Sequence, residues 1–179
     1  MQKCGNGWNV GKGLWQVEGR GNLNGEENTN LKYYAAVAMD VDLQESKLSA
    51  LEIVKILLDN GFWAFSGSAP VKEKLAVGDK ILFYVGGRGR HYFIANGLVK
   101  STVNNANDEQ KVILNSLGIA FFSKVVSIGE IEWFGTPIEL IPLKERLSFI
   151  ADKKNYGLSL RLPLREITEE DYKMIISIN

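Results

Sequence analysis

The stretch Gly61-Phe62-Trp63-Ala64-Phe65 places three aromatic rings within four residues, directly after a segment whose apolar residues have helical spacing. It is followed by Val71-Lys72-Glu73-Lys74-Leu75 and by the strand-like run Lys80–Val85. Gly61 ends the helical pattern, and we predict that a loop begins there and carries Trp63. An aromatic ring in a loop beside basic residues is typical of a pocket that stacks a planar base. Nucleic-acid recognition is therefore the first hypothesis.

The composition is that of one soluble globular domain, with 179 residues, 45% hydrophobic and 23% charged. Because 21 Lys and Arg balance 21 Asp and Glu, nucleic-acid binding would need a local basic patch. The single cysteine, Cys4, excludes an intrachain disulfide and a multi-cysteine zinc site. The chain shows neither a secretory leader nor an apolar run near roughly 18 residues. We therefore expect a soluble, cytoplasmic protein without a membrane partner.

Residues 1–30 differ in amino-acid composition from the rest of the chain. They hold seven of the 18 glycines, six asparagines and the isolated Trp8 and Trp15. Gly and Asn favour turns, so a long regular element is not expected here. Two readings stay open: a flexible arm with one short strand near Leu14–Val17, or an ordered extension that lends a Trp to a binding surface. We predict a nucleic-acid-binding domain over residues 31–179.

Within that domain the pattern predicts a strand-dominated α+β fold with one long early helix. Apolar residues at helical spacing predict a helix over residues 48–58, capped by Ser46 or Ser49 and ended by Asn60-Gly61. Runs rich in apolar residues predict strands at Tyr33–Met39, Lys80–Val85, His91–Leu98, Phe121–Val126, Glu130–Phe134, Ile138–Leu140 and Leu158–Pro163.

The connections between these elements also carry signals. Gly86–Arg90 is interpreted as a hairpin loop, and the polar run Asn104–Gln110 as a surface loop. A short helix is predicted over residues 143–149. Thr168, followed by three acidic residues, is expected to cap a last helix.

The titratable residues do not predict an active site, a metal or a cofactor. His91 is the only histidine, which excludes His-rich metal sites, and we expect it to be partly exposed in the hairpin. Glu130, Glu132 and the acidic run 169–171 are interpreted as solvated surface. The Gly86–Arg90 segment lacks the spacing of a phosphate-binding P-loop and is not followed by a helix.

Aromatic and basic residues are the more informative set. Trp63 is predicted to contact a ligand. Trp133, which lies amid alternating apolar residues, is predicted to be core. Positive charge gathers in two groups: Lys72, Lys74, Arg88, Arg90 and Lys100, and later Lys153, Lys154, Arg161 and Arg165. Each group is either an ordinary solvated face or a rim that binds phosphates.

The order of these segments resembles the EVE and YTH branch of the PUA-like superfamily over roughly residues 31–175. The matching pieces follow one another as Tyr34–Asp40, Leu48–Asn60, Gly61–Trp63, Val71–Leu75, Ile81–Val85, Gly86–Arg90, Ile94–Ser101, Gly129–Trp133 and Ile138–Leu143. The tail, from Arg146–Ile150 to Glu169–Tyr172, is especially similar to EVE domains. The resemblance implies a curved mixed sheet or barrel of five to six strands, flanked by helices.

The resemblance also implies a site. In the family an aromatic cage encloses a methylated base, and the matching positions make Trp63 one wall. Ala64 is expected to offer backbone polar atoms, and Asp40 a polar side chain, to the base. The usual second Trp is missing from the Ser101–Ser123 loop. Its substitutes in this chain are Phe121, Phe122 or a Trp of the arm, Trp8 or Trp15.

We therefore predict a non-enzymatic reader of modified nucleic acid. It flips out and binds one methylated base, N6-methyladenine or 5-methylcytosine, with DNA favoured over RNA. The basic residues Lys72, Lys74, Arg88, Arg90, Lys100, Lys153, Lys154 and Arg161 are expected to hold its backbone. The resemblance further suggests the specificity module of a modification-dependent restriction system, with a fused or associated effector. The alternatives are an RNA-binding accessory domain without strong selectivity for modification, or a small hydrolase of the ASCH type.

Overall fold

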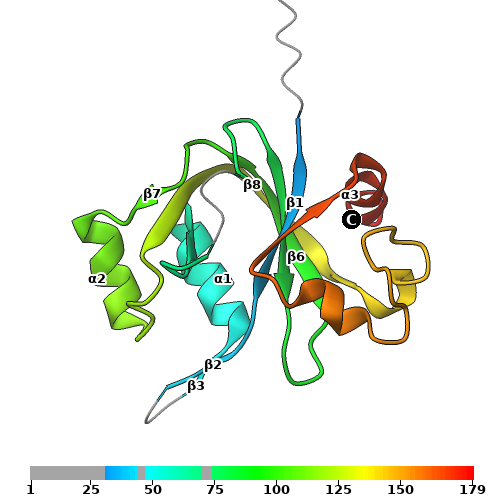
Figure 1. The fold of residues 1–179 in the computed structure, drawn as a ribbon, viewed down its shortest axis with the longest axis horizontal. Helices are drawn as coiled ribbons and strands as arrows, with labels where there is room; N and C mark the ends of the chain where they lie inside the picture. The colour runs from blue at the N-terminus through cyan, green and yellow to red at the C-terminus, as the bar shows by residue number, and fades with distance from the viewer. Residues whose placement is uncertain (1–30, 44–46, 70–73) are drawn as a thin grey trace, which may run out of the picture.

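The computed structural model describes residues 31–43, 47–69 and 74–179. Its main feature is a curled mixed sheet with the strand order β4-β8-β6-β5-β1-β9, in which short β7 also pairs with β8 (Figure 1). The strands are β1 (Tyr33–Ala38), β4 (Phe62–Phe65), β5 (Lys80–Val85), β6 (Tyr92–Val99), β7 (Asn104–Asn105), β8 (Lys124–Glu139) and β9 (Leu164–Ile167). Strand β1 runs parallel to β5, whereas the other neighbours are antiparallel. The predicted curved sheet flanked by helices is confirmed.

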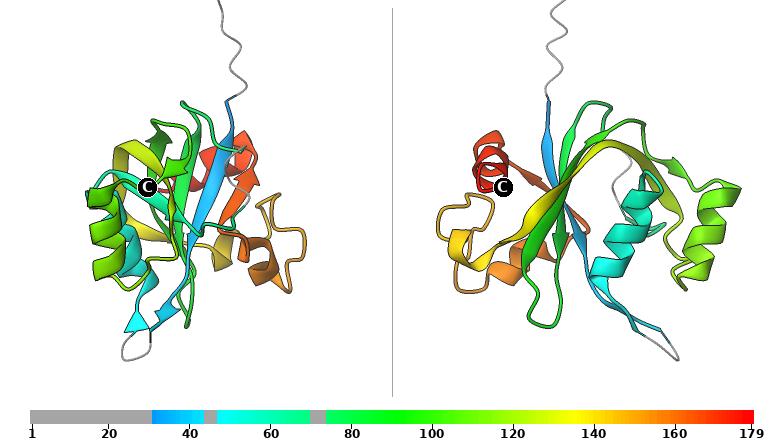
Figure 2. Two further views of the ribbon diagram at one scale, coloured as in Figure 1. Left: turned by 60° about the vertical axis from the view of Figure 1, so that its left-hand side comes forward. Right: turned by 180° about the vertical axis from the view of Figure 1, so that it is seen from behind.

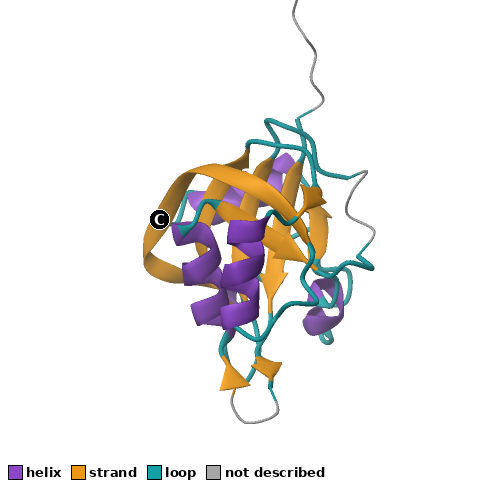
Figure 3. Ribbon diagram, turned by 90° about the vertical axis from the view of Figure 1, so that its left-hand side faces the viewer, coloured by secondary structure: helices purple, strands orange, loops and turns teal. Residues whose placement is uncertain are grey.

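Helices cover both faces of this sheet. Helices α1 (Ala50–Asp59) and α2 (Asp108–Ser116) lie on one side, and Figure 3 shows them in front of the strands. Helix α3 (Glu169–Ile176) lies on the other side, together with the 3₁₀ turns η1 (Ile141–Leu143) and η2 (Tyr156–Leu160) (Figure 2). A separate small hairpin consists of β2 (Val41–Asp42) and β3 (Lys47–Leu48). None of the helices in the described ranges is long and apolar enough to cross a membrane.

Strand β1 contributes to a core on each face. Tyr34 and Ala36 pack in the core that contains α1, whereas Tyr33 and Ala35 pack in the core that contains α3. Strand β5 alternates in the same way. A strand buried on both faces shows a continuous apolar run rather than alternation, which is why β1 and β5 are recognisable in the sequence.

The predicted helix caps are confirmed. Ser49 caps α1: its hydroxyl accepts from the Glu52 N–H (3.2 Å), and the Glu52 carboxylate accepts from the Ser49 N–H (3.1 Å). Gly61 follows the helix with a φ of +70°, a conformation that glycine adopts without strain. At α3, the Thr168 hydroxyl accepts from the Asp171 N–H at 3.1 Å.

Three predicted strands between Phe121 and Leu140 are one strand, β8. Its pairing with β6 shifts register between Asn96 and Leu98 and again between Phe93 and Ala95. Near the first shift, Glu130 has a φ of +50°, the left-handed conformation of an extra residue in a β-bulge. The bulges interrupt the side-chain alternation, so the sequence pattern breaks where the strand continues.

Several other local predictions are wrong. The run Asn104–Gln110 is not a loop: it contains β7 and the first residues of α2. The predicted helix over residues 143–149 is reduced to the last residue of η1 and a series of turns. The predicted strand Leu158–Pro163 is the end of η2 and a turn, and the strand β9 follows it. Trp133 is 40% exposed rather than core.

Helix α2 has a sequence signal at its N-terminus. The Asn107 side chain accepts from the Gln110 N–H (2.8 Å), and the Gln110 side chain accepts from the Asn107 N–H (3.0 Å). An N-cap residue followed three positions later by Gln is a capping box. Because Leu114 is the one buried residue of this helix, its hydrophobic pattern is too weak to predict it.

The first β8 bulge gives a test of the fold. A Cβ on Gly97 would lie 2.8 Å from Ile128 Cγ2 and 3.3 Å from the Gly129 carbonyl oxygen, so Gly97→Ala forces the strands apart. We expect a loss of about 1–3 kcal/mol in the free energy of unfolding, measured by urea denaturation. Gly135→Ala is the matched control, because a Cβ there meets nothing within 4 Å. Equal stability of the two variants would contradict this account of the bulge.

Candidate nucleic-acid interface

One cavity of about 210 Å³ gathers residues from distant parts of the chain. It lies where the end of β1, helix α1, strand β4, the segment before β8 and the residues before β9 meet. We call it the central pocket and define it by its lining residues Asp40, Trp63, Ala64, Phe121, Phe122 and Arg161. Five of the seven residues predicted to contact a base therefore border one cavity, and the other two, Trp8 and Trp15, lie outside the described residues.

The prediction that a loop carries Trp63 is wrong, because Trp63 lies in strand β4. Its side chain is 3% exposed, and its ring lies 5.1 Å from that of Phe83 between centroids. The four residues of β4 are all buried, because the strand closes the sheet over α1. Trp63 therefore belongs to the core and at the same time forms a fixed wall of the central pocket.

Ala64 turns its backbone polar groups away from the sheet. Strand β4 ends the strand order, so it pairs with β8 on one side only. The Gly61 carbonyl accepts from the Ile128 N–H at 2.8 Å. In the same register, Trp63 and Phe65 fall in the hydrogen-bonded pairs of this antiparallel ladder. The N–H and C=O of Ala64 consequently face the open edge of the sheet, beside the pocket.

Phe121 and Phe122 form the outer side of the pocket. Phe121 is 54% exposed, and the two rings meet edge to face with centroids 4.5 Å apart. The Gly67 N–H donates to the Phe121 carbonyl at 3.2 Å, which ties this segment to the residues after β4. Met39 and Leu162, also exposed, lie at the same cavity. Exposed apolar side chains gathered at one cavity are typical of a binding site.

Asp40 accepts three hydrogen bonds from two donors. The Arg90 guanidinium donates to both carboxylate oxygens (2.6 and 2.8 Å), and the Ala50 N–H donates to Oδ1 (2.9 Å). The Ala50 N–H and the Arg90 guanidinium hold the pKa of Asp40 below its ordinary value, although burial opposes them. The interaction joins the end of β1, the start of α1 and the β5–β6 hairpin. A carboxylate accepts about four hydrogen bonds, so one lone pair stays available.

The other predicted phosphate-binding residues are dispersed. Arg161 borders the central pocket and is exposed, and Arg88, Lys74 and Lys154 are exposed elsewhere. Arg90 pairs with Asp40, and Lys100 with Glu130. Lys153 donates to the Leu147 carbonyl at 2.6 Å, and Lys72 is outside the described residues. Arg161 is thus the cation of this set that the structure places at the pocket without a side-chain partner among the described residues.

The two buried carboxylates of the described ranges, Asp79 and Asp171, have structural partners. The buried Asp79 accepts from the Lys32 and Ala76 N–H groups, and the buried Asp171 accepts from the Ser148 and Phe149 N–H groups. His91 is half-buried, as expected, and bonds to the Tyr84 hydroxyl. No three His, Cys, Asp or Glu side chains of the described part of the chain lie together in a way that suits a metal ion.

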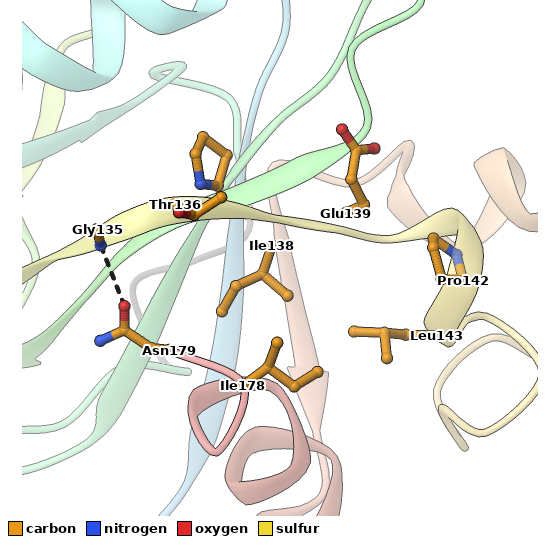
Figure 4. Close-up of a pocket in the computed structure, with 9 residues that line it drawn as sticks. Gly135, Thr136, Ile138, Glu139, Pro142, Leu143, Ile178 and Asn179 are labelled. Atoms are coloured by element: carbon orange, nitrogen blue, oxygen red, sulfur yellow. Dashed lines mark hydrogen bonds between the residues drawn. The ribbon is translucent and has the colours of Figure 1, made fainter.

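A further cavity, of about 400 Å³, lies between the second half of β8 and the residues after α3 (Figure 4). Ile138, Leu143 and Ile178 point into it, and the Gly135 N–H donates to the Asn179 side chain at 3.1 Å across its edge. None of the residues predicted to bind a base or a phosphate lines this cavity. The central pocket is therefore the better candidate.

The Asp40 interaction makes stability depend on pH in a defined direction. Because folding lowers the pKa of Asp40, its stabilisation is present above the ordinary value of 3.8 and is lost as the pH falls through the lowered pKa. We expect Asp40→Asn to lose about 1–3 kcal/mol of unfolding free energy at pH 7, and much less once the pH lies below the lowered pKa of Asp40. Asp42→Asn is the control, because its pair with Lys47 is on the surface. The unfolding free energies are measured by urea denaturation. A difference between the unaltered protein and Asp40→Asn that does not change with pH would refute this role.

Comparisons with known proteins place this fold among related structures of low sequence identity. Human THYN1, solved in complex with DNA containing 5-methylcytosine, is 12% identical, with a TM-score of 0.56 over 82% of this chain and 96% of that one. The YTH domain of the Zygosaccharomyces rouxii MRB1 protein, solved with N6-methyladenosine RNA, is 16% identical (TM-score 0.51; 84% and 87% covered). A hypothetical protein from Leishmania major is 15% identical (TM-score 0.53; 83% and 94% covered).

Sequence comparison gives the family itself. A search of curated proteins finds no match. The model of the EVE domain family matches residues 61–178, which is more than half of the 179-residue chain. This segment contains β4, the β5–β6 hairpin, β8 and α3, and so includes most of the sheet and the Trp63 wall. The chain therefore belongs to the EVE domain family, within the PUA-like group that its sequence resembles.

Proposed function

We propose that this protein binds nucleic acid by taking one modified base into the central pocket. The observation that carries the proposal is the convergence of Trp63, Ala64, Asp40, Phe121 and Phe122 on a single cavity. A cavity of about 150 Å³ accommodates benzene. The 210 Å³ of the central pocket suits one planar base and is too small for a base pair.

The two aromatic walls have different roles. Trp63, fixed in β4 against Phe83, gives a rigid surface, whereas the exposed Phe121 lies at the outer side, where a base would enter. Extruding a base from a stack costs a few kcal/mol. Stacking on aromatic walls returns ~1–3 kcal/mol per base. The pocket therefore favours a base that is already unpaired or is weakly held.

Selectivity for the base rests on polar groups rather than on the methyl group. Burying one methyl contributes roughly 0.8 kcal/mol, or about fourfold in affinity. The N–H and C=O of Ala64 offer one donor and one acceptor to a base edge, and the ionised Asp40 offers a further acceptor. An acceptor suits the exocyclic amino group of cytosine or adenine and disfavours a carbonyl oxygen at that position. The proposed ligands are therefore 5-methylcytosine and N6-methyladenine.

The relatives solved with 5-methylcytosine DNA and with N6-methyladenosine RNA support a ligand of this class. The preference for DNA over RNA, and a role in a restriction system with an associated effector, stay predictions of the sequence resemblance. The proposed activity is binding without turnover. The alternative small hydrolase would need a Lys and Glu constellation in a cleft. Lys72-Glu73-Lys74 offers these residue types, but residues 72 and 73 lie outside the described residues.

Phe121→Ala is the most informative binding variant. Trp63→Ala would leave a cavity in the core, at a cost of about 3–5 kcal/mol, so loss of binding would not separate from unfolding. Phe121 is half exposed, and its removal spares the core. We expect affinity for oligonucleotides with 5-methylcytosine or N6-methyladenine to fall about 5- to 150-fold in fluorescence anisotropy, the equivalent of ~1–3 kcal/mol of stacking.

Trp133→Ala is the matched control, because Trp133 is an exposed aromatic residue outside the central pocket. It should bind like the unaltered protein. Unmodified DNA and RNA of the same sequence complete the series, at a fixed salt concentration. If Phe121→Ala and Trp133→Ala lose the same affinity for the modified oligonucleotides, the central pocket is not the base-binding site. Binding that falls steeply with salt but ignores modification would favour the RNA-binding accessory domain.

A further inference from the structure

A second, larger cavity adjoins the central pocket. It encloses about 480 Å³ next to the β5–β6 hairpin and is lined by Met39, Tyr84, Gly86, His91, Leu158 and Arg161, among others. We call it the hairpin pocket. Met39 and Arg161 also line the central pocket, so these two residues form the boundary between the cavities. Of its lining residues, the sequence analysis assigned only Arg161 to a ligand.

The hairpin pocket has the chemistry of a site for a planar, polar ring. The His91 ring is held by the Tyr84 hydroxyl at Nδ1 (3.0 Å) and meets the Tyr156 ring edge to face at 5.6 Å. Burial raises the pKa of Tyr84, so the phenol stays neutral. In either tautomer of His91, Nε2 can donate or accept one further hydrogen bond, and it has no partner for this bond among the described residues. Leu158, 48% exposed, adds an apolar surface.

Met39 separates the two cavities, and the neighbouring backbone makes room for it. Its side chain is 50% exposed, although it is large and apolar. A Cβ on Gly86 would lie 2.5 Å from the Met39 sulfur, so the glycine permits the close approach. Of the ten large apolar side chains exposed in the described ranges, four line the two pockets: Met39, Phe121, Leu158 and Leu162.

Arg161 is placed to contact both pockets. Its side chain is exposed, and its guanidinium has no acceptor among the described residues. An unpaired guanidinium is well suited to a phosphate, which it binds through two parallel N–H donors. In a nucleic acid, one phosphate links each pair of consecutive nucleotides. A cation at the boundary of the two cavities is therefore suited to a phosphate that joins a nucleotide in one cavity to a nucleotide in the other.

We propose that the hairpin pocket binds the base next to the modified one, with Met39 between the two bases and Arg161 on the phosphate that joins them. The inference rests on the proposed function of the central pocket. Two bases on opposite sides of Met39 cannot stack on each other. A duplex would have to extrude both, each at a cost of a few kcal/mol. The ligand is therefore a single-stranded segment, and the site reads two consecutive nucleotides.

The test uses single-stranded oligonucleotides with one central modified base, in which the base of either the 5′ or the 3′ neighbour is removed to leave an abasic residue. We expect one of the two removals to weaken binding about 5- to 150-fold, since one stacked base contributes ~1–3 kcal/mol. His91→Ala should weaken binding of the intact oligonucleotide and cause no further loss with that abasic one. Met39→Ala, at an exposed position, should behave in the same way even where His91→Ala folds poorly.

Phe121→Ala is the control from the central pocket, and it should weaken binding of the intact and abasic oligonucleotides by the same factor. The proposal is overturned if neither abasic oligonucleotide binds more weakly, or if His91→Ala and Met39→Ala weaken all of them equally. In both cases the central pocket keeps its assignment, provided that modified and unmodified oligonucleotides still differ. If modification and Phe121→Ala have no effect, the proposed function fails and this inference fails with it.

Discussion

The bend of β8 is the constraint on which the pocket depends. This strand pairs with β4 at its first residues and with β6 along the rest, so its path decides where β4 lies. Gly97 permits the close approach of Ile128, and Glu130 takes the left-handed conformation of the bulge. Because the strand curls instead of running straight, β4 reaches the end of β1 across α1. The central pocket is the space between them.

The Asp40 interaction fixes the opposite side of the same space. It connects the end of β1 with the N-terminus of α1 and with Arg90 at the base of the hairpin. A partly buried carboxylate that accepts three hydrogen bonds is costly to disturb, since each donor would lose its partner. The pocket thus has one wall set by the sheet and another set by an ion pair. Such preorganisation limits the entropy that a ligand must lose to bind.

Much of the fold was predictable because local and global preferences agree. Strands β1 and β5 are buried on both faces, and their continuous apolar runs indicated them in the sequence. The capping residues Ser49 and Thr168 indicated where α1 and α3 begin. The failures have physical causes. The bulges of β8 broke its alternation, and α2 buries too little surface to show a period. Trp63 follows a helix end, which suggested a loop, but pairing with β8, more than 60 residues later in the sequence, makes it a strand.

The site was predictable in its parts and not in its arrangement. The family resemblance selected the residues that line the central pocket, including Phe121 and Phe122 in place of the missing Trp. It did not reveal that Arg90 pairs with Asp40 instead of facing solvent, because that contact spans 50 residues of sequence. The hairpin pocket was also hidden, since it combines residues whose own local patterns indicate nothing beyond a hairpin and a turn.

Amide chemical shifts can locate the ligand without any substitution. We would titrate ¹⁵N-labelled protein with a short single-stranded oligonucleotide that carries one 5-methylcytosine, and repeat the titration with N6-methyladenine. The largest shifts should fall on the Ala64 amide, the Trp63 indole and the amides of Phe121 and Phe122. Gly135 and Asn179, at the cavity beyond β8, should not move. Shifts that gather away from β4, or that are the same for the unmodified oligonucleotide, would contradict a base-binding central pocket.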